Sequence, residues 1–403
     1  MSKKRMVMKH MFLFLMFTVV SFGQTKGIYT SIDKKMDAIP DSFTKSTDSI
    51  ALYVNTNFKT ENDKIRAIFY WTASNISYDE ENMFVVNYNE TREDRTAKTL
   101  KTKKGICNDY ADVFNKIANA SGIKAIVISG YTKTNEMVDD LSHSWCAAKI
   151  ENKWYVFDPT WGRSYLKSEN KNYIRNTTNS YFKIAPEIMI HSHMPFDYLW
   201  QFMDYPLTNQ EFIDGVIAAD ASKVKFDFIK EIARYEALSK ANQFFESSER
   251  IKKNGMKNQF VSQAYVNAMN QWNYEKDKEN RDKFNENLSK VNAISKRYKE
   301  AFKRLNDFGN YRNRKFQPSF SDEVIKKSIQ ELRDELAKCK VDICDVEFIG
   351  DQNKANLDNL DNNISKSLAK AEEHLQFVTL YLTKPKSVRE TMFYTVARSS
   401  KPN

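Results

Sequence analysis

Hydrophobic positions along this chain follow two different patterns. Before about residue 215, short runs of β-branched and aromatic residues alternate with segments of helical spacing. The runs predict strands, and the spaced segments predict helices. The expected strands are Ile123–Ser129, His143–Ile150 and Lys153–Asp158, and the expected helices are Asp63–Asn75 and Cys107–Ala120. This part of the chain is therefore expected to fold as mixed α and β.

Beyond residue 220 the pattern is helical throughout. Apolar residues from Leu357 to Leu382 step by three or four positions, and similar stripes cover 284–305 and 325–336. Such stripes are typical of amphipathic helices that pack into a bundle or partly as a coiled coil. We therefore expect a mixed domain over 24–215 and an all-helical domain over 220–403.

The first residues have the pattern of a secretory signal. Lys3, Lys4, Arg5 and Lys9 precede an apolar run at Met11–Phe22, and small residues stand before Gln24. The run is shorter than the roughly 20 residues that a membrane-spanning helix needs. We expect residues 1–23 to be a cleaved signal peptide of a bacterial protein exported to the periplasm or beyond the cell, with no transmembrane segment left in the mature chain.

The net charge is distributed unevenly along the chain, and this distribution changes which partners it suggests. The whole sequence of 403 residues has a formal net charge of +10, which suggests a nucleic-acid partner. Four of these charges lie in the signal segment, residues 24–222 carry −3 (23 basic, 26 acidic), and residues 223–403 carry +9 (35 basic, 26 acidic). An exported protein with an acidic first domain is not expected to bind nucleic acid.

Cys107 is the first candidate for chemistry. It opens a predicted helix and follows Lys103-Lys104-Gly105-Ile106. Backbone N–H groups at a helix start and nearby lysines stabilise a thiolate. The alternative is a small buried residue, which is the usual state of cysteine.

His143 and Asp158 are the second and third candidates. If Glu151-Asn152 forms a two-residue turn, residue 150 pairs with 153 and residue 145 pairs with 158. His143 and Asp158 then share one face of the hairpin at diagonal positions, while Cys146 faces the core. A carboxylate in this position can fix the tautomer of the imidazole. Together the three side chains suggest a nucleophile, a base and an orienting group.

The same residues carry a resemblance to a known family. The stretches Gly105–Ala111, Gly122–Ala125, His143–Trp145 and Trp154–Thr160 resemble the transglutaminase-like superfamily, and Lys64–Asp79 is similar to the upstream helix of its kyphoscoliosis-peptidase and cytokinesis-type branch. The resemblance covers 62–162 well and extends in weaker form to 213. It implies a papain-like α+β core, with the helix that bears Cys107 packed on an antiparallel sheet, and a catalytic triad of Cys107, His143 and Asp158.

Tryptophans near the triad receive secondary roles. Animal transglutaminases stabilise the oxyanion with a tryptophan upstream of the nucleophile, and the resemblance transfers this role to Trp71; the alternative is a core position. The backbone N–H of Cys107 is the first oxyanion donor that we expect. We expect Trp145 and Trp161 to line the substrate cleft.

Other polar clusters are expected to be structural. His191 and His193 could face one metal ion, but no third ligand is evident, so we predict no metal and no cofactor. Cys339 and Cys344 are expected in a loop between two helices, where a disulfide is one of two open outcomes.

The function that these patterns favour is acyl transfer on protein or peptide amides by an exported cysteine enzyme. Hydrolysis by a peptidase or amidase is preferred, with a cell-envelope protein as a possible class of substrate. Two alternatives stay open: a protein cross-linking transglutaminase, and a non-catalytic interaction protein that uses the same cleft and the helical tail.

Overall fold

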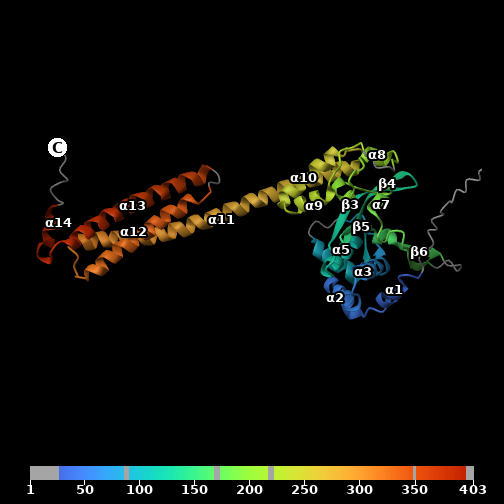
Figure 1. Ribbon diagram of the computed structural model, residues 1–403, viewed down its shortest axis with the longest axis horizontal. Coiled ribbons are helices and arrows are strands. Elements are labelled where there is room, and N and C mark those ends of the chain that lie inside the picture. Colours follow the sequence, from blue (N-terminus) through green and yellow to red (C-terminus); the bar gives the residue numbers. More distant parts are fainter. Residues whose placement is uncertain (1–26, 86–89, 168–172, 217–221, 348–350, 396–403) are drawn as a thin grey trace, which may run out of the picture. The chain divides into compact units, whose positions relative to one another are not determined.

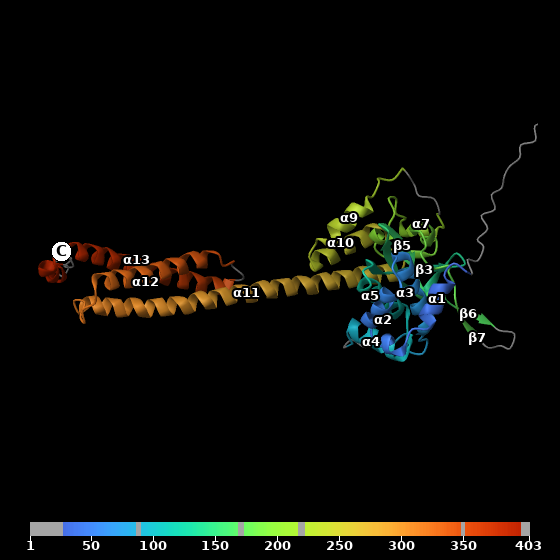
Figure 2. The same cartoon turned by 60° about the horizontal axis from the view of Figure 1, so that its bottom comes forward.

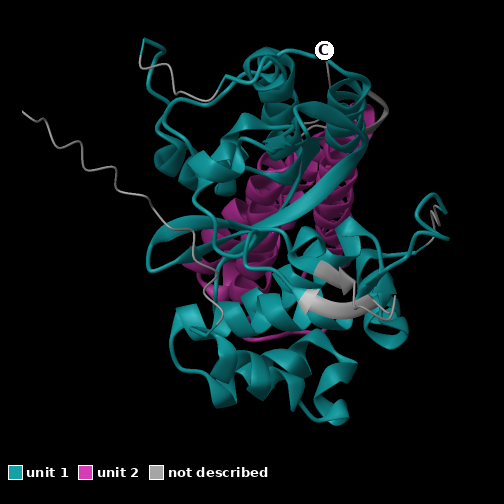
Figure 3. Cartoon of the chain, turned by 90° about the vertical axis from the view of Figure 1, so that its right-hand side faces the viewer, with its two compact units in different colours: residues 1–272 teal, residues 273–403 magenta. Residues whose placement is uncertain are grey.

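The computed structural model describes residues 27–85, 90–167, 173–216, 222–347 and 351–395. The predicted signal peptide lies outside these residues. The chain divides into two compact units, residues 1–272 and 273–403 (Figure 3). No helix among the described residues is both long and apolar enough to cross a membrane.

The first unit is built on a four-stranded antiparallel sheet with the strand order β5-β4-β3-β8 (Figure 1). Its strands are β3 (Ala125–Thr134), β4 (Met137–Ile150), β5 (Lys153–Phe157) and β8 (His193–Pro195). Short pairs β1–β2 (Ser77–Tyr78, Lys104–Gly105) and β6–β7 (Arg163–Lys167, Tyr173–Thr177) lie outside this sheet.

Helices cover both faces of the sheet (Figures 1 and 2). On one face, a core that includes Phe114, Cys146 and Phe157 packs against α2, α3 and α5. On the other, Trp145 and Ala147 pack against α7, η2 and α9. The helices of the first unit are α1 (Thr30–Asp37), η1 (Asp41–Lys45), α2 (Thr47–Asn57), α3 (Glu61–Asn75), α4 (Arg92–Thr102), α5 (Cys107–Ala120), α6 (Pro159–Gly162), α7 (Pro186–Met189), η2 (Tyr198–Gln201), α8 (Asn209–Ile213), α9 (Phe228–Glu236) and α10 (Lys240–Lys253).

The β4–β5 hairpin has the predicted register. Glu151 and Asn152 form the turn with φ of 49° and 66°, which suits a two-residue hairpin. Ile150 pairs with Lys153, and Cys146 pairs with Phe157. Because side chains alternate along a strand, neighbouring positions 145 and 146 enter the two different cores. The prediction that Cys146 is a core residue is confirmed.

The second unit consists of helices. α11 (Gln259–Asn313) begins in the first unit and continues into the second, where it is followed by α12 (Asp322–Cys344), α13 (Asp351–Thr383), η3 (Lys386–Thr391) and α14 (Met392–Thr395). Leu305, Leu332 and Val378 belong to one shared core of α11, α12 and α13. The predicted fold class, a cysteine-bearing helix on an antiparallel sheet followed by C-terminal helices, is confirmed.

Two details differ from the sequence-based expectations. The boundary between units falls at 272/273 and not at 215–220, because Ile232 of α9 and Ile251 of α10 are buried in cores of the first unit. Cys339 and Cys344 both lie in the last turns of α12 and not in a loop. Both are free thiols, with Cys339 buried and Cys344 exposed.

Candidate active site

Cys107 is the first residue of α5, as the sequence suggested. Ile106 before it is extended, with φ of −98°, and its N–H donates to Asp109 Oδ2 at 2.9 Å. The strand β2 immediately before it pairs with β1 through Tyr78 and Gly105. A Cβ at Gly105 would lie 2.7 Å from the Cβ of Asp109, so the close approach requires glycine. These contacts fix the start of α5 and therefore the place of the thiol of Cys107, a residue that is 8% exposed.

His143 on β4 and Asp158 after β5 meet as the hairpin register predicted. The Nε2 of His143 lies 2.7 Å from Oδ2 of Asp158, and the thiol of Cys107 is near enough to the same ring to raise its pKa. Since Nε2 is bonded to the carboxylate, Nδ1 is the ring atom left for the thiol. The structure thus brings all three predicted residues together around one imidazole.

Every oxygen of Asp158 is occupied. Its Oδ1 accepts the N–H groups of Thr160 at 2.8 Å and Trp161 at 3.1 Å, because Asp158 is also the N-cap of α6. Its Oδ2 is shared by His143 and His193, the latter at 3.2 Å. The side chain is fully buried. A carboxylate held in this way has a fixed orientation toward the imidazole.

Charges around the row favour an imidazolium. Burial alone would lower the pKa of His143, but the charge and hydrogen bond of Asp158, together with Cys107, outweigh burial and raise it to about 10. Burial would raise the pKa of Asp158, yet its histidine partners hold it below its ordinary value. At neutral pH, His143 is therefore protonated and Asp158 is ionised.

His193 is a neighbour of the triad to which the sequence gave no catalytic role. It is 1% exposed, and burial lowers its pKa although Asp158 acts in the opposite sense. A neutral histidine has one donor and one acceptor nitrogen. Nε2 is then the donor to Asp158, while Nδ1 accepts from the hydroxyl of Ser192 at 2.7 Å. Its partner was not predictable, because β8 joins the sheet beside β3 and not beside the hairpin.

The two tryptophans expected in the cleft pack against the imidazole. The ring centroid of Trp145 lies 6.1 Å from that of His143 in a stacked arrangement, and Trp161 lies at 5.5 Å. Trp145 is 1% exposed. Neither is among the residues that line the cleft in front of the triad.

Trp71 is also away from the cleft. It is fully buried in the core of α2, α3 and α5, with the ammonium of Lys103 4.6 Å from its ring centroid. The structure does not bring Trp71 together with the lining of the cleft. Tyr78 does line it, and burial, followed by the nearby Cys107, raises the pKa of Tyr78 to about 12. Its hydroxyl therefore stays protonated and can donate a hydrogen bond.

The cleft has a volume of about 640 Å³ and opens over Cys107 and His143. One side comes from the predicted catalytic region and includes Tyr78, Val127 and Ser129. The other side comes from α10 and the start of α11, which sequence reasoning had assigned to the tail. The residues that these two helices contribute are Phe244, Ser247, Ile251, Ala264, Asn267, Ala268 and Gln271.

His143, Asp158 and His193 also form the kind of cluster in which metal ions are held. Their ligand atoms lie within 4.8 Å of one another, and all three residues are buried. However, both distances to Oδ2 are those of hydrogen bonds, and one oxygen serves both rings. The same contacts are fully explained by one carboxylate between two histidines.

Part of the chain is similar to known proteins. The transglutaminase-like superfamily model matches residues 48–159. Kyphoscoliosis peptidase of Mus musculus is 24% identical over 37% of this chain and 23% of its own length. Cytokinesis protein 3 of Saccharomyces cerevisiae is 24% identical over 48% of this chain and 22% of its own. A crystal structure of a TGase, 18% identical, covers 38% of each chain with a TM-score of 0.23.

The chain spans about a quarter of the length of these curated relatives. The family match contains the segment that supplies Cys107, His143 and Asp158, whereas α10 and α11 lie beyond it. Residues 48–159 of this chain are therefore similar to the transglutaminase-like superfamily.

Proposed function

We propose that this chain is an exported cysteine-dependent enzyme that hydrolyses amide bonds of proteins or peptides by acyl transfer. Cys107 is the nucleophile, His143 is the general acid and base, and Asp158 orients His143. The observation that carries the proposal is the meeting of these three side chains, with Cys107 and His143 lining a cleft and His143 bonded to the buried Asp158. The relative named kyphoscoliosis peptidase supports hydrolysis.

The first half of the reaction forms a thioester. The sulfur of Cys107, having given its proton to His143, attacks the carbonyl carbon of the amide, and the carbonyl oxygen becomes an oxyanion. The backbone N–H of Cys107 is at the start of a helix, where N–H groups lack an intrahelical acceptor, and it can donate to this oxyanion. His143 then protonates the amine, the C–N bond breaks, and the amine leaves.

The second half of the reaction regenerates the free enzyme. His143, now neutral, takes a proton from water as the water oxygen attacks the thioester. The C–S bond breaks and the carboxylic acid product leaves. The proton taken from water stays on His143, so the imidazolium again lies beside the thiolate of Cys107. If an amine enters in place of water, the same steps give cross-linking, so the triad serves both reactions.

The test of the nucleophile uses a thiol that the chain itself provides as a reference. Mature protein is treated with iodoacetamide between pH 5 and pH 9, and labelling of Cys107 and of the exposed Cys344 is followed by mass spectrometry. An ordinary thiol loses about tenfold in reactivity per pH unit below its pKa of about 8.5. We expect Cys107 to react at pH 6, where Cys344 hardly reacts, and His143→Ala to slow it.

Parallel behaviour of the two thiols would refute the enzyme proposal and favour a non-catalytic protein. A glutamine-containing peptide incubated with and without a primary amine then separates the two reactions. Hydrolysis should dominate, whereas a dominant amine adduct would assign the chain to cross-linking. N-terminal sequencing of exported protein tests the predicted cleavage before Gln24.

A further inference from the structure

The second side of the cleft is built with helical periodicity. Phe244, Ser247 and Ile251 follow the i, i+3, i+7 spacing of one face of α10. Ala264, Ala268 and Gln271 lie on one face of α11 in the same way. Residues spaced like this share one side of a helix, so two helix faces, and not scattered side chains, oppose Cys107. We call them the helical wall.

The helical wall is attached to the catalytic body by a buried ion pair. Nε and Nη2 of Arg250, on α10, donate to the two oxygens of Asp197 at 2.7 and 2.8 Å, and both side chains are less than a tenth exposed. Asp197 follows β8 and itself lines the cleft. Arg250 thus reaches from the helical wall to the segment that carries His193.

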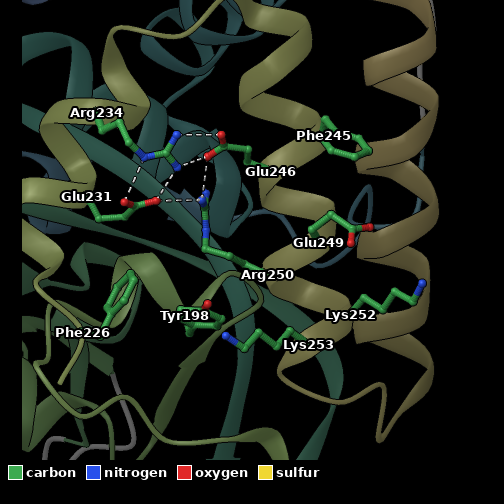
Figure 4. Close-up of a pocket in the computed structure, with 10 residues that line it drawn as sticks. All are labelled: Tyr198, Phe226, Glu231, Arg234, Phe245, Glu246, Glu249, Arg250, Lys252 and Lys253. Atoms are coloured by element: carbon green, nitrogen blue, oxygen red, sulfur yellow. Dashed lines mark hydrogen bonds and ion pairs between the residues drawn. The ribbon is translucent and has the colours of Figure 1, made fainter. Parts of the chain in front are cut away.

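Further charges complete the attachment (Figure 4). Nη1 of Arg250 lies 3.5 Å from Glu246 and 3.8 Å from Glu231. Arg234, on α9, donates to the same two glutamates, so two arginines and two glutamates join α9 to α10. The side chain of Asn209 also donates to the carbonyl of Gly255, at 2.6 Å, directly after α10. The helical wall is therefore a fixed part of the first unit.

The described residues that line the cleft carry almost no free charge. Apart from the reacting pair Cys107 and His143, its charged lining residue is Asp197, which Arg250 neutralises. The other lining side chains are apolar, hydroxyl or amide groups. A charged side chain that entered the cleft would lose water and find no partner, which costs free energy. An apolar side chain loses nothing of this kind and gains from burial.

We propose that the helical wall selects the substrate of the proposed enzyme: a peptide segment whose side chains beside the reacting amide are uncharged, with an aromatic or branched aliphatic side chain against Phe244 and Ile251. This inference rests on the proposed function. The cleft volume of about 640 Å³ is that of a binding site for a short segment. Asn267 and Gln271 carry amides, which both donate to and accept from a peptide backbone.

The test uses peptidyl acyloxymethyl ketones, which alkylate an active-site thiol without turnover. Two probes differ only in the residue beside the ketone, phenylalanine or glutamate, and labelling of Cys107 in the full mature chain is measured by mass spectrometry. Iodoacetamide labelling of Cys107 normalises each rate. We expect the phenylalanine probe to react about 100-fold faster, within the range by which a pocket discriminates side chains.

A variant that adds a positive charge to the helical wall tests the preference between the two probes more sharply. Ser247→Arg places a cation in the helical wall and should narrow the ratio between the probes about tenfold, by accelerating the glutamate probe. Asn242→Arg adds the same charge to an exposed position of α10 that does not line the cleft, and it should leave the ratio unchanged.

The outcomes separate the two proposals. If Cys107 behaves toward iodoacetamide as an ordinary thiol, the proposed enzyme itself is refuted. If Cys107 is activated but the two probes react equally, or if neither peptide probe reacts, the helical wall does not select uncharged peptides. The inference would also be overturned if Ser247→Arg and Asn242→Arg changed the ratio of the two labelling rates by the same factor.

Discussion

The two sides of the cleft are stabilised by opposite means. On the catalytic side, ionisable groups are buried and face one another: His143 and Asp158 are joined at 2.7 Å, and Asp158 has no exposed surface. On the helical wall, the residues that line the cleft are uncharged, and Arg250 of α10 neutralises Asp197. On the catalytic side the charged groups take part in the proposed reaction, whereas on the other side an ion pair holds an uncharged surface in place.

Asp158→Asn should produce the largest change, and only on the catalytic side. The amide cannot stabilise the imidazolium, and loss of a comparable aspartate lowers kcat by about 10⁴-fold. We expect a loss of that order with KM little changed, measured with a fluorogenic peptide. Asp140→Asn, on an exposed carboxylate of the same strand, is the control. A loss of less than about tenfold would mean that Asp158 does not orient His143.

Arg250→Met should destabilise the attachment of the helical wall. It removes the cation that neutralises the buried carboxylate of Asp197, which costs about 3 kcal/mol of the free energy of unfolding. Arg234→Met is the matched control, because Arg234 binds the same glutamates but its side chain is 47% exposed, and exposed pairs contribute about 1 kcal/mol or less. Urea unfolding of both variants measures the difference. Equal losses would contradict the assignment of Arg250 as the attachment point.

His193→Leu tests the second histidine on Asp158. Without its N–H, one side of the carboxylate loses a donor, and we expect kcat to fall about tenfold with KM nearly constant, in the lower range of a single positioning hydrogen bond. His193→Gln can keep a donor near the same place and should recover part of kcat. If both variants raise KM and leave kcat unchanged, His193 acts on the cleft and not through Asp158.

The pH dependence gives the smallest effect. His143 has a pKa of about 10, above its ordinary value of 6.5, so its proton is present at neutral pH and is lost as pH rises through 10. We expect kcat/KM to be level from pH 8 to 9 and to reach half near pH 10. The protonation of His143 contributes to the free energy of unfolding in full below pH 6.5, and this contribution is lost as pH rises from 6.5 through 10. His143→Gln should abolish this pH dependence of stability.

Chelation separates the triad from a metal site. The cluster of His143, Asp158 and His193 is compact enough for an ion, but our mechanism uses none. Hydrolysis after exhaustive treatment with EDTA or phenanthroline should equal that of untreated protein. Activity that disappears and returns with added zinc would replace the cysteine mechanism by metal-assisted hydrolysis.

Local rules made much of the catalytic side predictable. The turn at Glu151 and Asn152 determines the β4–β5 register, and the register decides which residues share a face, so the meeting of His143 and Asp158 followed from counting. The start of α5 at Cys107 followed from its own sequence and the preceding glycine. Such features depend on neighbours within about fifteen residues.

The helical wall was not predictable for a physical reason. Amphipathic spacing shows that a helix buries one face, but it does not show which body the face packs against. α9, α10 and the start of α11 have the same hydrophobic spacing as the later helices, so the sequence predicts them as part of the tail. The same limit applies to His193, whose contact with Asp158 depends on the pairing of β8 with β3, in which Thr132 pairs with His193.

The full occupation of Asp158 constrains how this chain can change over generations. Four donors, on His143, Thr160, Trp161 and His193, converge on two oxygen atoms. Substitutions at these positions share one partner, so their effects should not add. A descendant that lost Asp158 would inherit two histidines and a short helix fitted to a charge no longer present. Drift in this family should therefore change these positions together or leave them alone.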